Sequence, residues 1–293
     1  MKPIRKLYFQ NASGQRQGLN GEQGVFASEL SGFGFSLAPD FSDLSRGFFS
    51  QTDSEKEPQN TLAFTMTFTR SAYTTYERLI DWLAAAGTIT IVYNPTGTQE
   101  YYRDVTVSYI QKSELTQTAW LECPSSFLCT TPWYMPVPSV VSLIADDINK
   151  IKRYTYRYTP DLMYGSGDNS SMAAVIQKGG HIPAALEFSY LGGIDNPVIR
   201  LVGKTSGKTH GVCSVKSSFG ATETLMLSTR YENSYVKKIH ADGREEDLID
   251  AVDLSGNPFF RIPEDEPCEI FLDSESQITG RATLLIYYYF RSV

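Results

Sequence analysis

The sequence predicts a mainly β protein of two domains, and three observations lead to this. Its 293 residues include 18 Tyr and 16 Phe, and aromatic residues favour the pleated, half-buried surface of a sheet. Short runs in which apolar and polar residues alternate recur along the chain, as expected of strands with one buried face. Near the middle, Pro132, Pro136 and Pro138 lie within a few residues, and proline cannot continue a central strand or a helix. We therefore expect a boundary here, between domains 1–136 and 137–293.

We expect the first domain to be a β-sandwich-like sheet with one helix and a β-hairpin. It opens with short strands broken by Gly and polar turns. Apolar residues alternate with polar ones over 62–68, which predicts a strand with one buried face. Two more alternating runs, 89–93 and 101–110, are separated by the turn sequence Asn-Pro-Thr-Gly at 94–97, so we expect a hairpin. A further strand is expected over 118–128.

One helix interrupts these strands. Ser71 is of a type that caps helix N-termini, and Gly87 is suited to a left-handed C-terminal cap, so we expect a helix over 72–86. Trp82 and Leu83 are adjacent and cannot both face the sheet fully, and the apolar stripe favours Leu83. The residues of this stripe are Tyr73, Tyr76, Leu79, Ile80 and Leu83.

The second domain reads as an all-β sandwich from residue 185 onward. Asp242-Gly243 predicts a tight hairpin turn. The segment 139–180 mixes an apolar piece, a Tyr-rich basic run and a Gly/Ser loop, and its pattern assigns no definite structure. The expected strands, separated by turn residues, are LEFSYL, PVIRLV, GVCSV, TLMLS, YVKKIH, CEIFLD and ATLLIYYYF.

The segment GKTSGKT, Gly203–Thr209, resembles a phosphate-binding loop. A Walker A loop needs four residues between its glycines, whereas this segment has three, with Val202 at the place of the first glycine. The loop must also open a helix, but the residues that follow alternate like a strand. We therefore expect a solvated turn between two strands.

Residues with reactive or metal-ligating side chains form no catalytic or metal-binding signature in the sequence. The three histidines, His181, His210 and His240, are far apart in sequence. The acidic runs 245–247 and 264–266 could supply paired carboxylates of a glycosidase, but adjacent acids in turns are usually a solvated face. The pair Asp146-Asp147 is equally weak evidence for a functional site. The four cysteines lack metal-ligand spacing and are expected to be buried thiols: Cys123, Cys129, Cys213 and Cys268. We assign no catalytic, cofactor-binding or metal-binding residue and expect no cofactor.

Charge and hydropathy also bear on the partners. The net charge is −7, so the chain lacks the basic footprint of a dedicated nucleic-acid binder. The run KIKRYTYRY at 150–158 could grip phosphate and stack bases, or form an amphipathic strand edge that meets an acidic subunit. The longest apolar run, 284–290, is far shorter than the ~20 residues of a membrane span. The N-terminal residues lack the apolar core of a signal peptide, so we expect synthesis in a cytoplasm and no membrane insertion.

The order of elements resembles the distal tail proteins of long-tailed bacteriophages. The first half is similar to their N-terminal belt domain through TLAFTMTFT, SAYTTYERLIDWL, TITIVYNPTGTQEYYRDVTV, TAWLECPSSF and TTPWY. The second half is similar to their galectin-like C-terminal sandwich through LIDAVDLSGNPFFRIP and the terminal ATLLIYYYFRSV. The resemblance covers 60–135 and 185–293. Glu264 to Pro267 replace the family's usual Gly and Asn, which predicts a different turn there.

The resemblance implies a structural role and no enzyme activity. Distal tail proteins form six-fold rings at the tail tip, so it implies a homo-hexamer closed by the N-terminal domains around a DNA channel. We expect sheet edges of the hairpin 88–110 to supply the ring contact, since open edges tend to pair. The implied partners are the tail tube protein, the tail-associated hub protein and receptor-binding or baseplate proteins, with DNA only passing through. The implied location is the virion tail tip, after synthesis in the bacterial host.

Two other classes of function remain open from the sequence. A carbohydrate-binding β-sandwich module would need an exposed aromatic platform, which the sequence does not distinguish from core. A glycoside hydrolase or esterase on a sandwich scaffold would need a catalytic site, and no signature of one is present. The large carbohydrate-binding insertion of some distal tail proteins is absent from this chain, which weakens the case for direct sugar binding.

Overall fold

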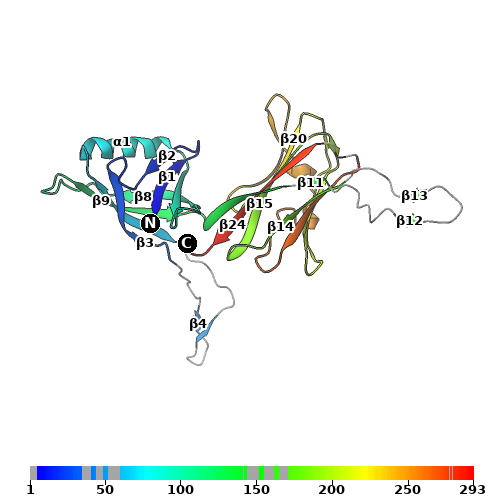
Figure 1. Cartoon of the computed structure of the whole chain (residues 1–293), viewed down its shortest axis with the longest axis horizontal. Coiled ribbons are helices and arrows are strands. Elements are labelled where there is room, and N and C mark those ends of the chain that lie inside the picture. The colour runs from blue at the N-terminus through cyan, green and yellow to red at the C-terminus, as the bar shows by residue number, and fades with distance from the viewer. Residues whose placement is uncertain are drawn as a thin grey trace. The chain divides into compact units, whose positions relative to one another are not determined.

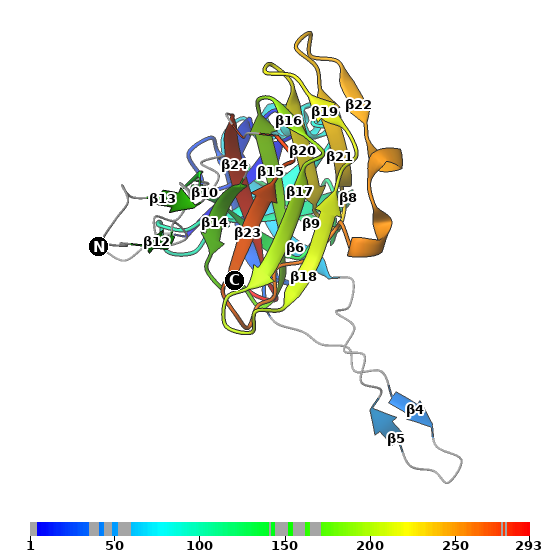
Figure 2. The same ribbon diagram turned by 90° about the vertical axis from the view of Figure 1, so that its right-hand side faces the viewer.

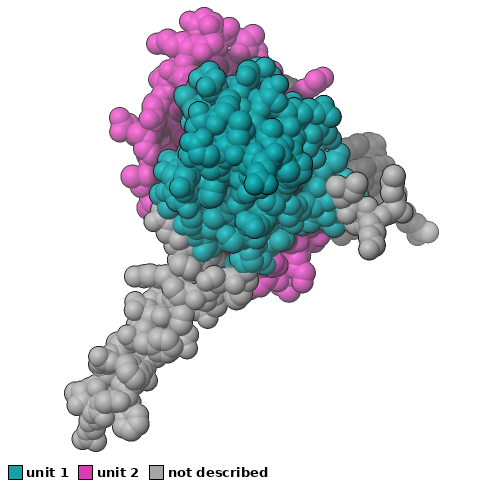
Figure 3. All heavy atoms as spheres, turned by 90° about the vertical axis from the view of Figure 1, so that its left-hand side faces the viewer, with its two compact units in different colours: residues 1–135, 290–293 teal, residues 136–289 magenta. Residues whose placement is uncertain are grey.

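The computed structural model describes residues 5–34, 41–43, 49–51, 60–140, 142–143, 152–154, 162–164, 171–276, 278 and 280–293. The chain divides into two compact units, coloured teal and magenta in Figure 3. Unit 1 comprises Met1–Met135 and Phe290–Val293, and unit 2 comprises Pro136–Tyr289. The chain therefore leaves unit 1 close to the expected boundary at 136 and returns to it for its last four residues.

Unit 1 contains strands and one α-helix, which Figure 1 shows lying along one side of the strands. Its elements are β1 (Lys6–Asn11), β2 (Arg16–Gly18), β3 (Val25–Ser31), β4 (Phe41–Asp43), β5 (Phe49–Gln51), β6 (Thr61–Phe68), α1 (Ala72–Ala85), β7 (Ile89–Asn94), β8 (Tyr101–Ile110), β9 (Leu121–Cys129) and the start of β10 (Trp133–Val140).

The main sheet of unit 1 closes on itself. Antiparallel pairing runs in the order β1, β7, β8, β9, β6 and β3. The amide of Ala27 in β3 then donates to the carbonyl of Leu19, at 3.0 Å, and the amide of Leu19 donates to the carbonyl of Leu7 in β1, at 2.9 Å. These bonds link the first and last strands of the expected sandwich-like sheet into a small barrel.

The barrel core is aromatic and aliphatic. The inward residues of β6 are almost fully buried, as their alternation predicts. Phe64 stacks on Phe127 of β9 with ring centroids 4.9 Å apart, and Phe9 of β1 lies 5.3 Å from Phe127. Trp133 is also buried, with its ring 5.4 Å from that of Phe33. Burial of large side chains like these supplies most of the stability of a small barrel.

The hairpin predicted at 89–110 is confirmed, and the strand pairing shows which of its edges are occupied. β7 lies between β1 and β8, and the first half of β8 lies between β7 and β9. The turn is held by the side chain of Asn94, which accepts a hydrogen bond from the amide of Gly97 at 2.5 Å. β7 is therefore paired along both edges, whereas residues 106–110 of β8 pair with β9 and lie beyond the stretch paired with β7. The expected ring contact through an edge of this hairpin stays a prediction.

Helix α1 is confirmed, with two corrections at its N-terminus. Ser71 does not cap the helix with its side chain, because its backbone is left-handed, with φ at 44°. Tyr73 is exposed, whereas Leu79 and Leu83 are buried, so the stripe begins later than predicted. Gly87 is left-handed, with φ at 68°, as expected after a helix end. Leu83 faces the core and Trp82 is half-buried, as predicted.

The prediction that the three prolines end strand structure is also wrong. β10 runs through Pro136 and Pro138, and the units divide inside it, after Met135. The fixed φ of proline fits an extended strand. Residues two apart direct their backbone nitrogens to the same side, so the missing N–H groups of Pro136 and Pro138 lie along one edge. The strand expected at 118–128 spans Leu121–Cys129.

Unit 2 is a sandwich of two antiparallel sheets, visible in Figure 2 as two layers. One sheet has the order β24–β15–β20–β21–β22, and the other β11–β14–β23–β17–β18. The elements are β11 (Ser142–Leu143), β12 (Lys152–Tyr154), β13 (Leu162–Tyr164), β14 (Ser171–Ile176), β15 (Ile182–Leu191), β16 (Ile194–Asp195), β17 (Val198–Gly203), β18 (Thr209–Ser214), β19 (Ser218–Phe219), β20 (Thr224–Thr229), β21 (Ser234–Ile239), β22 (Glu245–Asp247), the 3₁₀ turns η1 (Ile249–Ala251) and η2 (Leu254–Gly256), β23 (Cys268–Asp273) and β24 (Arg281–Phe290).

All seven strands predicted after residue 185 are present. The hairpin at Asp242-Gly243 is confirmed, since β21 pairs with β22 across this turn and Gly243 has φ at 84°. The segment after β22 protects the edge of β18. There the amide of Asp253 donates to the carbonyl of Ser214 at 3.0 Å. An edge covered in this way cannot pair with another chain.

Candidate functional sites

The loop that resembles a phosphate-binding loop is a turn between β17 and β18, as predicted. The amide of Gly203 donates to the carbonyl of Lys208, and the amide of Gly207 donates to the carbonyl of Gly203, each at 2.8 Å. β18 follows where a nucleotide-binding loop would need a helix. The loop lies beside the carboxylate of Glu266, which accepts hydrogen bonds from the hydroxyl and the amide of Ser206 at 2.8 and 3.0 Å.

Glu266 therefore takes the place of an external anion at this loop. The two hydrogen bonds from Ser206, the hydroxyl's first, lower the pKa of the Glu266 carboxyl to about 2, so it is charged at neutral pH. A phosphate approaching these donors would meet a negative charge already bound to them. This contact could not be predicted from the sequence, because Glu266 and Ser206 lie 60 positions apart.

His210 and His240 contact acidic residues. Nε2 of His210 lies 3.0 Å from Glu266, which belongs to the acidic run 264–266. His240 lies between two carboxylates, with Nδ1 2.9 Å from Glu223 and Nε2 2.7 Å from Glu246 of the run 245–247. Carboxylates on opposite sides of one ring cannot converge on a single ion, and within the described ranges no cluster of His, Cys, Asp and Glu could hold a metal.

The four cysteines are buried free thiols, as the sequence predicts. Burial raises the pKa of the Cys213 thiol to about 12 and that of Cys268 to about 11. The thiolate is the reactive form of cysteine, so both side chains are poor nucleophiles at neutral pH. They serve the interior of unit 2 as small apolar groups.

Several sequence candidates fall outside the described residues. Of the basic-aromatic run 150–158, the structure describes 152–154, which form β12 and pair with β13. The acidic pair Asp146-Asp147 and most of the Gly/Ser loop lie outside the described ranges. The predictions made for these segments stay predictions.

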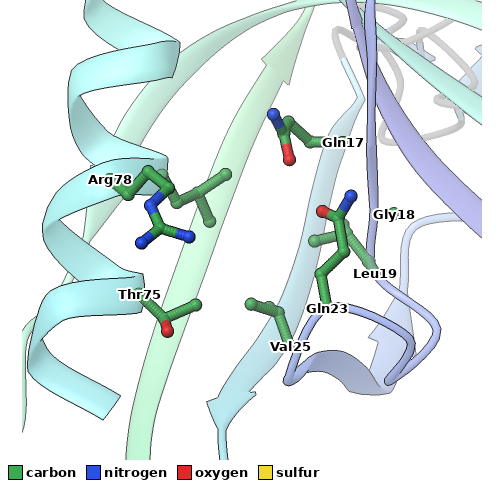
Figure 4. A pocket seen from close by; sticks show the side chains of 8 residues that line it. Gln17, Gly18, Leu19, Gln23, Val25, Thr75 and Arg78 are labelled. Carbon is green, nitrogen blue, oxygen red and sulfur yellow. The ribbon is translucent and has the colours of Figure 1, made fainter. Parts of the chain in front are cut away.

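A hollow of about 360 Å³, lined by both polar and apolar residues, lies beside helix α1, as Figure 4 shows. Thr75 and Arg78 of the helix face Gln17 and Gln23 across it. Leu79 also lines the hollow. A guanidinium, two amides and a hydroxyl can donate and accept hydrogen bonds, but they include no acid–base pair or nucleophile–base pair. This chemistry suits contact with another polar surface.

A second hollow, of about 510 Å³, is lined by carboxylates that the sequence analysis did not identify as candidates. Glu29, Glu114 and Glu122 lie around it together with Thr65, whose hydroxyl donates to Glu29 at 2.9 Å. These residues come from β3, β6, β9 and the β8–β9 connection, so only the fold brings them together. Their negative charge favours contact with a cationic or hydrogen-bonding group.

Tyr231 of unit 2 is an exposed aromatic residue, at 54% exposure. The guanidinium carbon of Arg261 lies 4.0 Å from the centre of its ring. A carbohydrate-binding platform needs an open aromatic face, and here one face is covered by a cation. The part of the chain that the structure describes contains no helix long and apolar enough to span a membrane.

These observations define a mainly β, two-unit protein whose surfaces offer contacts to other molecules. Comparison with known proteins gives the family. Residues 6–130 match the family model described as "Distal tail protein, N-terminal domain". The resemblance found in the sequence is thereby confirmed: the chain carries the N-terminal domain of the distal tail protein family. No curated protein matches the chain.

Solved structures show the same fold over the whole chain. The chain is similar to a protein in the baseplate of phage P2 in its activated conformation with Ca, with a TM-score of 0.67, 14% identity, and coverage of 99% of this chain and 100% of that one. It is also similar to the Dit protein of phage SPP1, described as a paradigm of hub adsorption apparatus in Gram-positive infecting phages. There the TM-score is 0.57 and the identity 10%, over 97% of this chain and 98% of that one.

Proposed function

We propose that this chain is the structural hub of a bacteriophage tail tip, in which six copies close into a ring through unit 1. The observation that carries the proposal is the match of 6–130 to the distal tail protein domain. The likeness to proteins of the P2 baseplate and the SPP1 adsorption hub, which extends over both units, supports it. The ring places the protein at the virion tail tip, after synthesis in the cytoplasm of the bacterial host.

The partners follow from this position. Unit 1 joins the tail tube protein and the tail-associated hub protein, and unit 2 carries receptor-binding or baseplate proteins. DNA passes through the ring without being held, which the net charge of −7 supports, because phosphate affinity depends on Lys and Arg.

The role is structural and involves no catalysis. The described histidines at 210 and 240 are engaged with carboxylates. The buried thiols of Cys213 and Cys268 have raised pKa values. Such groups stabilise a fold and are poorly placed to act on a substrate. Carbohydrate binding through unit 2 is the alternative, and the cation over Tyr231 weighs against it.

The assembly is tested by light scattering on the purified full chain over a range of concentrations. Six copies of 32.8 kDa give a mass of about 200 kDa. We expect this mass to dominate at high concentration and to fall on dilution if the contacts are weak. A mass that stays at one or two copies at every concentration would contradict the ring.

A further inference from the structure

The imidazole of His240 connects the last strand of one sheet of unit 2 to a neighbouring turn. His240 lies between β21 and β22, and β22 ends the sheet order β24–β15–β20–β21–β22, as Figure 2 shows. Its Nδ1 lies 2.9 Å from a carboxylate oxygen of Glu223, in the turn between β19 and β20. Its Nε2 lies 2.7 Å from Glu246, in the middle of β22. The ring therefore links β22 to a turn with which that strand does not pair.

A third charged group competes for one of these two contacts. In the turn between β21 and β22, a guanidinium nitrogen of Arg244 lies 3.1 Å from the same Nε2 of His240, and Asp242 accepts from the amide of Arg244 at 2.9 Å. A guanidinium only donates hydrogen bonds, and an ionised carboxylate only accepts them. A protonated Nε2 can donate to Glu246, whereas an unprotonated Nε2 can accept from Arg244. The protonation of the ring therefore decides which of the two side chains it holds.

The contact at Nδ1 is available in both protonation states. The carboxylate of Glu223 accepts from the amide of Gly220 at 2.7 Å and lies 2.8 Å from Nζ of Lys238, so it is held beside its own turn. These bonds, the one from the Gly220 amide first, lower the pKa of Glu223 to about 2, so it is an acceptor at neutral pH. A neutral ring with its proton on Nδ1 and a charged ring both donate to it. A change of protonation therefore acts on the Nε2 side.

The strand register shows which charged side chains surround the ring. Lys238 lies opposite Glu246 in the ladder and two residues before His240, so these three side chains share one face of the hairpin. The other acidic residues of β22 lie on the opposite face around Lys237, whose Nζ is 2.9 Å from Glu245. The charged groups that face the imidazole are Glu223, Lys238, Arg244 and Glu246.

We propose that His240 is a proton-controlled latch on strand β22. The charged ring donates to Glu246 and so holds β22, through Glu223, against the turn between β19 and β20. The neutral ring accepts from Arg244 instead and releases Glu246, whose side chain is 47% exposed and can move into solvent. Imidazole is the side chain that changes charge between about pH 5 and pH 8. The latch is therefore closed at acidic pH and opens as the pH rises through this range.

The latch acts on a strand at the edge of its sheet. A firmly held edge strand resists pairing with another chain, whereas a loosened one can pair or be displaced. The charge of one imidazole therefore changes the surface that unit 2 offers to a partner, at a pH close to neutral. This inference concerns unit 2 and does not depend on the proposed ring.

Amide hydrogen exchange of the full-length chain tests the latch. Exchange is followed by mass spectrometry at several pH values between about 5.5 and about 8.5, where imidazole changes charge. Each rate is divided by the intrinsic rate at the same pH, which gives a protection factor. We expect protection of the peptide 240–248 to fall about tenfold as the pH rises, because one charge-assisted hydrogen bond is lost. Protection of β15, in the middle of the same sheet, should stay constant.

Three variants identify the group responsible. His240→Gln keeps a hydrogen-bonding side chain that takes up no proton, so its protection at 240–248 should not change with pH. Glu246→Gln removes the charge that the protonated ring binds and should weaken the pH dependence. His210→Gln is the matched control, because His210 also contacts a carboxylate but lies in the other sheet, and it should keep the native dependence.

Two results would overturn the latch. One is native protection at 240–248 that is the same at both ends of the pH range. The other is a native pH dependence that persists in His240→Gln, whose folding is checked by circular dichroism. Should His240→Gln fail to fold, a Glu246→Gln chain with the full native dependence would overturn the latch equally.

Discussion

The carboxylate of Glu266 accepts hydrogen bonds from both the hydroxyl and the amide of Ser206, so an acidic side chain occupies the loop that resembles a nucleotide site. The loop offers its donors to the protein's own carboxylate and is followed by β18. Its resemblance to a phosphate-binding loop is confined to residue types.

We predict that this loop binds no nucleotide. Titration calorimetry of the full chain with Mg·ATP and with Mg·GTP should show no saturable heat, because Glu266 repels phosphate and no helix N-terminus faces the loop. Binding at micromolar concentration that disappears in Lys208→Ala would overturn this prediction.

Acid should destabilise unit 2. Hydrogen bonds lower the pKa of Glu266, chiefly from the Ser206 hydroxyl, and that of Glu223, chiefly from the amide of Gly220, each to about 2. A carboxyl whose pKa is lower in the folded state stabilises the fold above its unfolded pKa of about 4.5, and this contribution is lost as pH falls towards about 2.

Thermal unfolding measured in steps of about one pH unit between pH 6 and pH 2 checks this. The melting temperature of the native chain should fall through this window. Glu266→Gln cannot ionise, so its melting temperature should fall less steeply over the same range. Identical slopes for the two proteins would show that Glu266 carries no such linkage.

Leu83→Ala should destabilise unit 1 by about 2–5 kcal/mol, because it leaves a cavity under helix α1. Leu83 is 7% exposed and belongs to the barrel core. Asp81→Ala, on the exposed face of the same helix, should change the free energy of unfolding by less than about 0.5 kcal/mol. Chemical denaturation measures both. A loss for Leu83→Ala as small as that of the control would mean that the helix is rotated.

Gly211→Ala should destabilise unit 2 by about 1–3 kcal/mol through overpacking. A methyl group at this position would overlap the Cβ of Phe260 and lie 2.7 Å from the carbonyl oxygen of Asn257, both in the segment that follows η2. Gly220→Ala is the control, since its methyl group would lie no closer than 3.5 Å to any neighbour. Equal unfolding free energies for the two variants would show that the segment after η2 can shift to make room for the methyl group without a measurable cost.

Local signals in the sequence predicted most of the strands. The alternation at 62–68 and the Asp242-Gly243 turn each depend on residues that lie within one element, so both can be recognised from the sequence alone. The signal at Ser71 was misleading. A capping residue acts through its backbone conformation as well as its type, and Ser71 is left-handed.

The contacts that decide function depend on residues far apart in sequence. The hydrogen bonds from Ala27 to Leu19 and from Leu19 to Leu7 close the barrel, and nothing in the alternation of those strands shows that they meet. An apolar hollow of about 390 Å³ lies between helix α1 and strand β8, and the periodicity of these two segments does not show that they meet. The sequence could therefore predict the family and the elements, whereas the surfaces available for assembly required the structure.

Electron microscopy of the purified full chain at high concentration tests the ring most directly. Averages of particles viewed along the axis should show a closed ring with six equal lobes around a central channel, because head-to-tail contacts close only when the rotation per subunit divides a full turn. Particles that contain a single copy, or two copies related by a two-fold axis, would contradict the ring and the hub function with it.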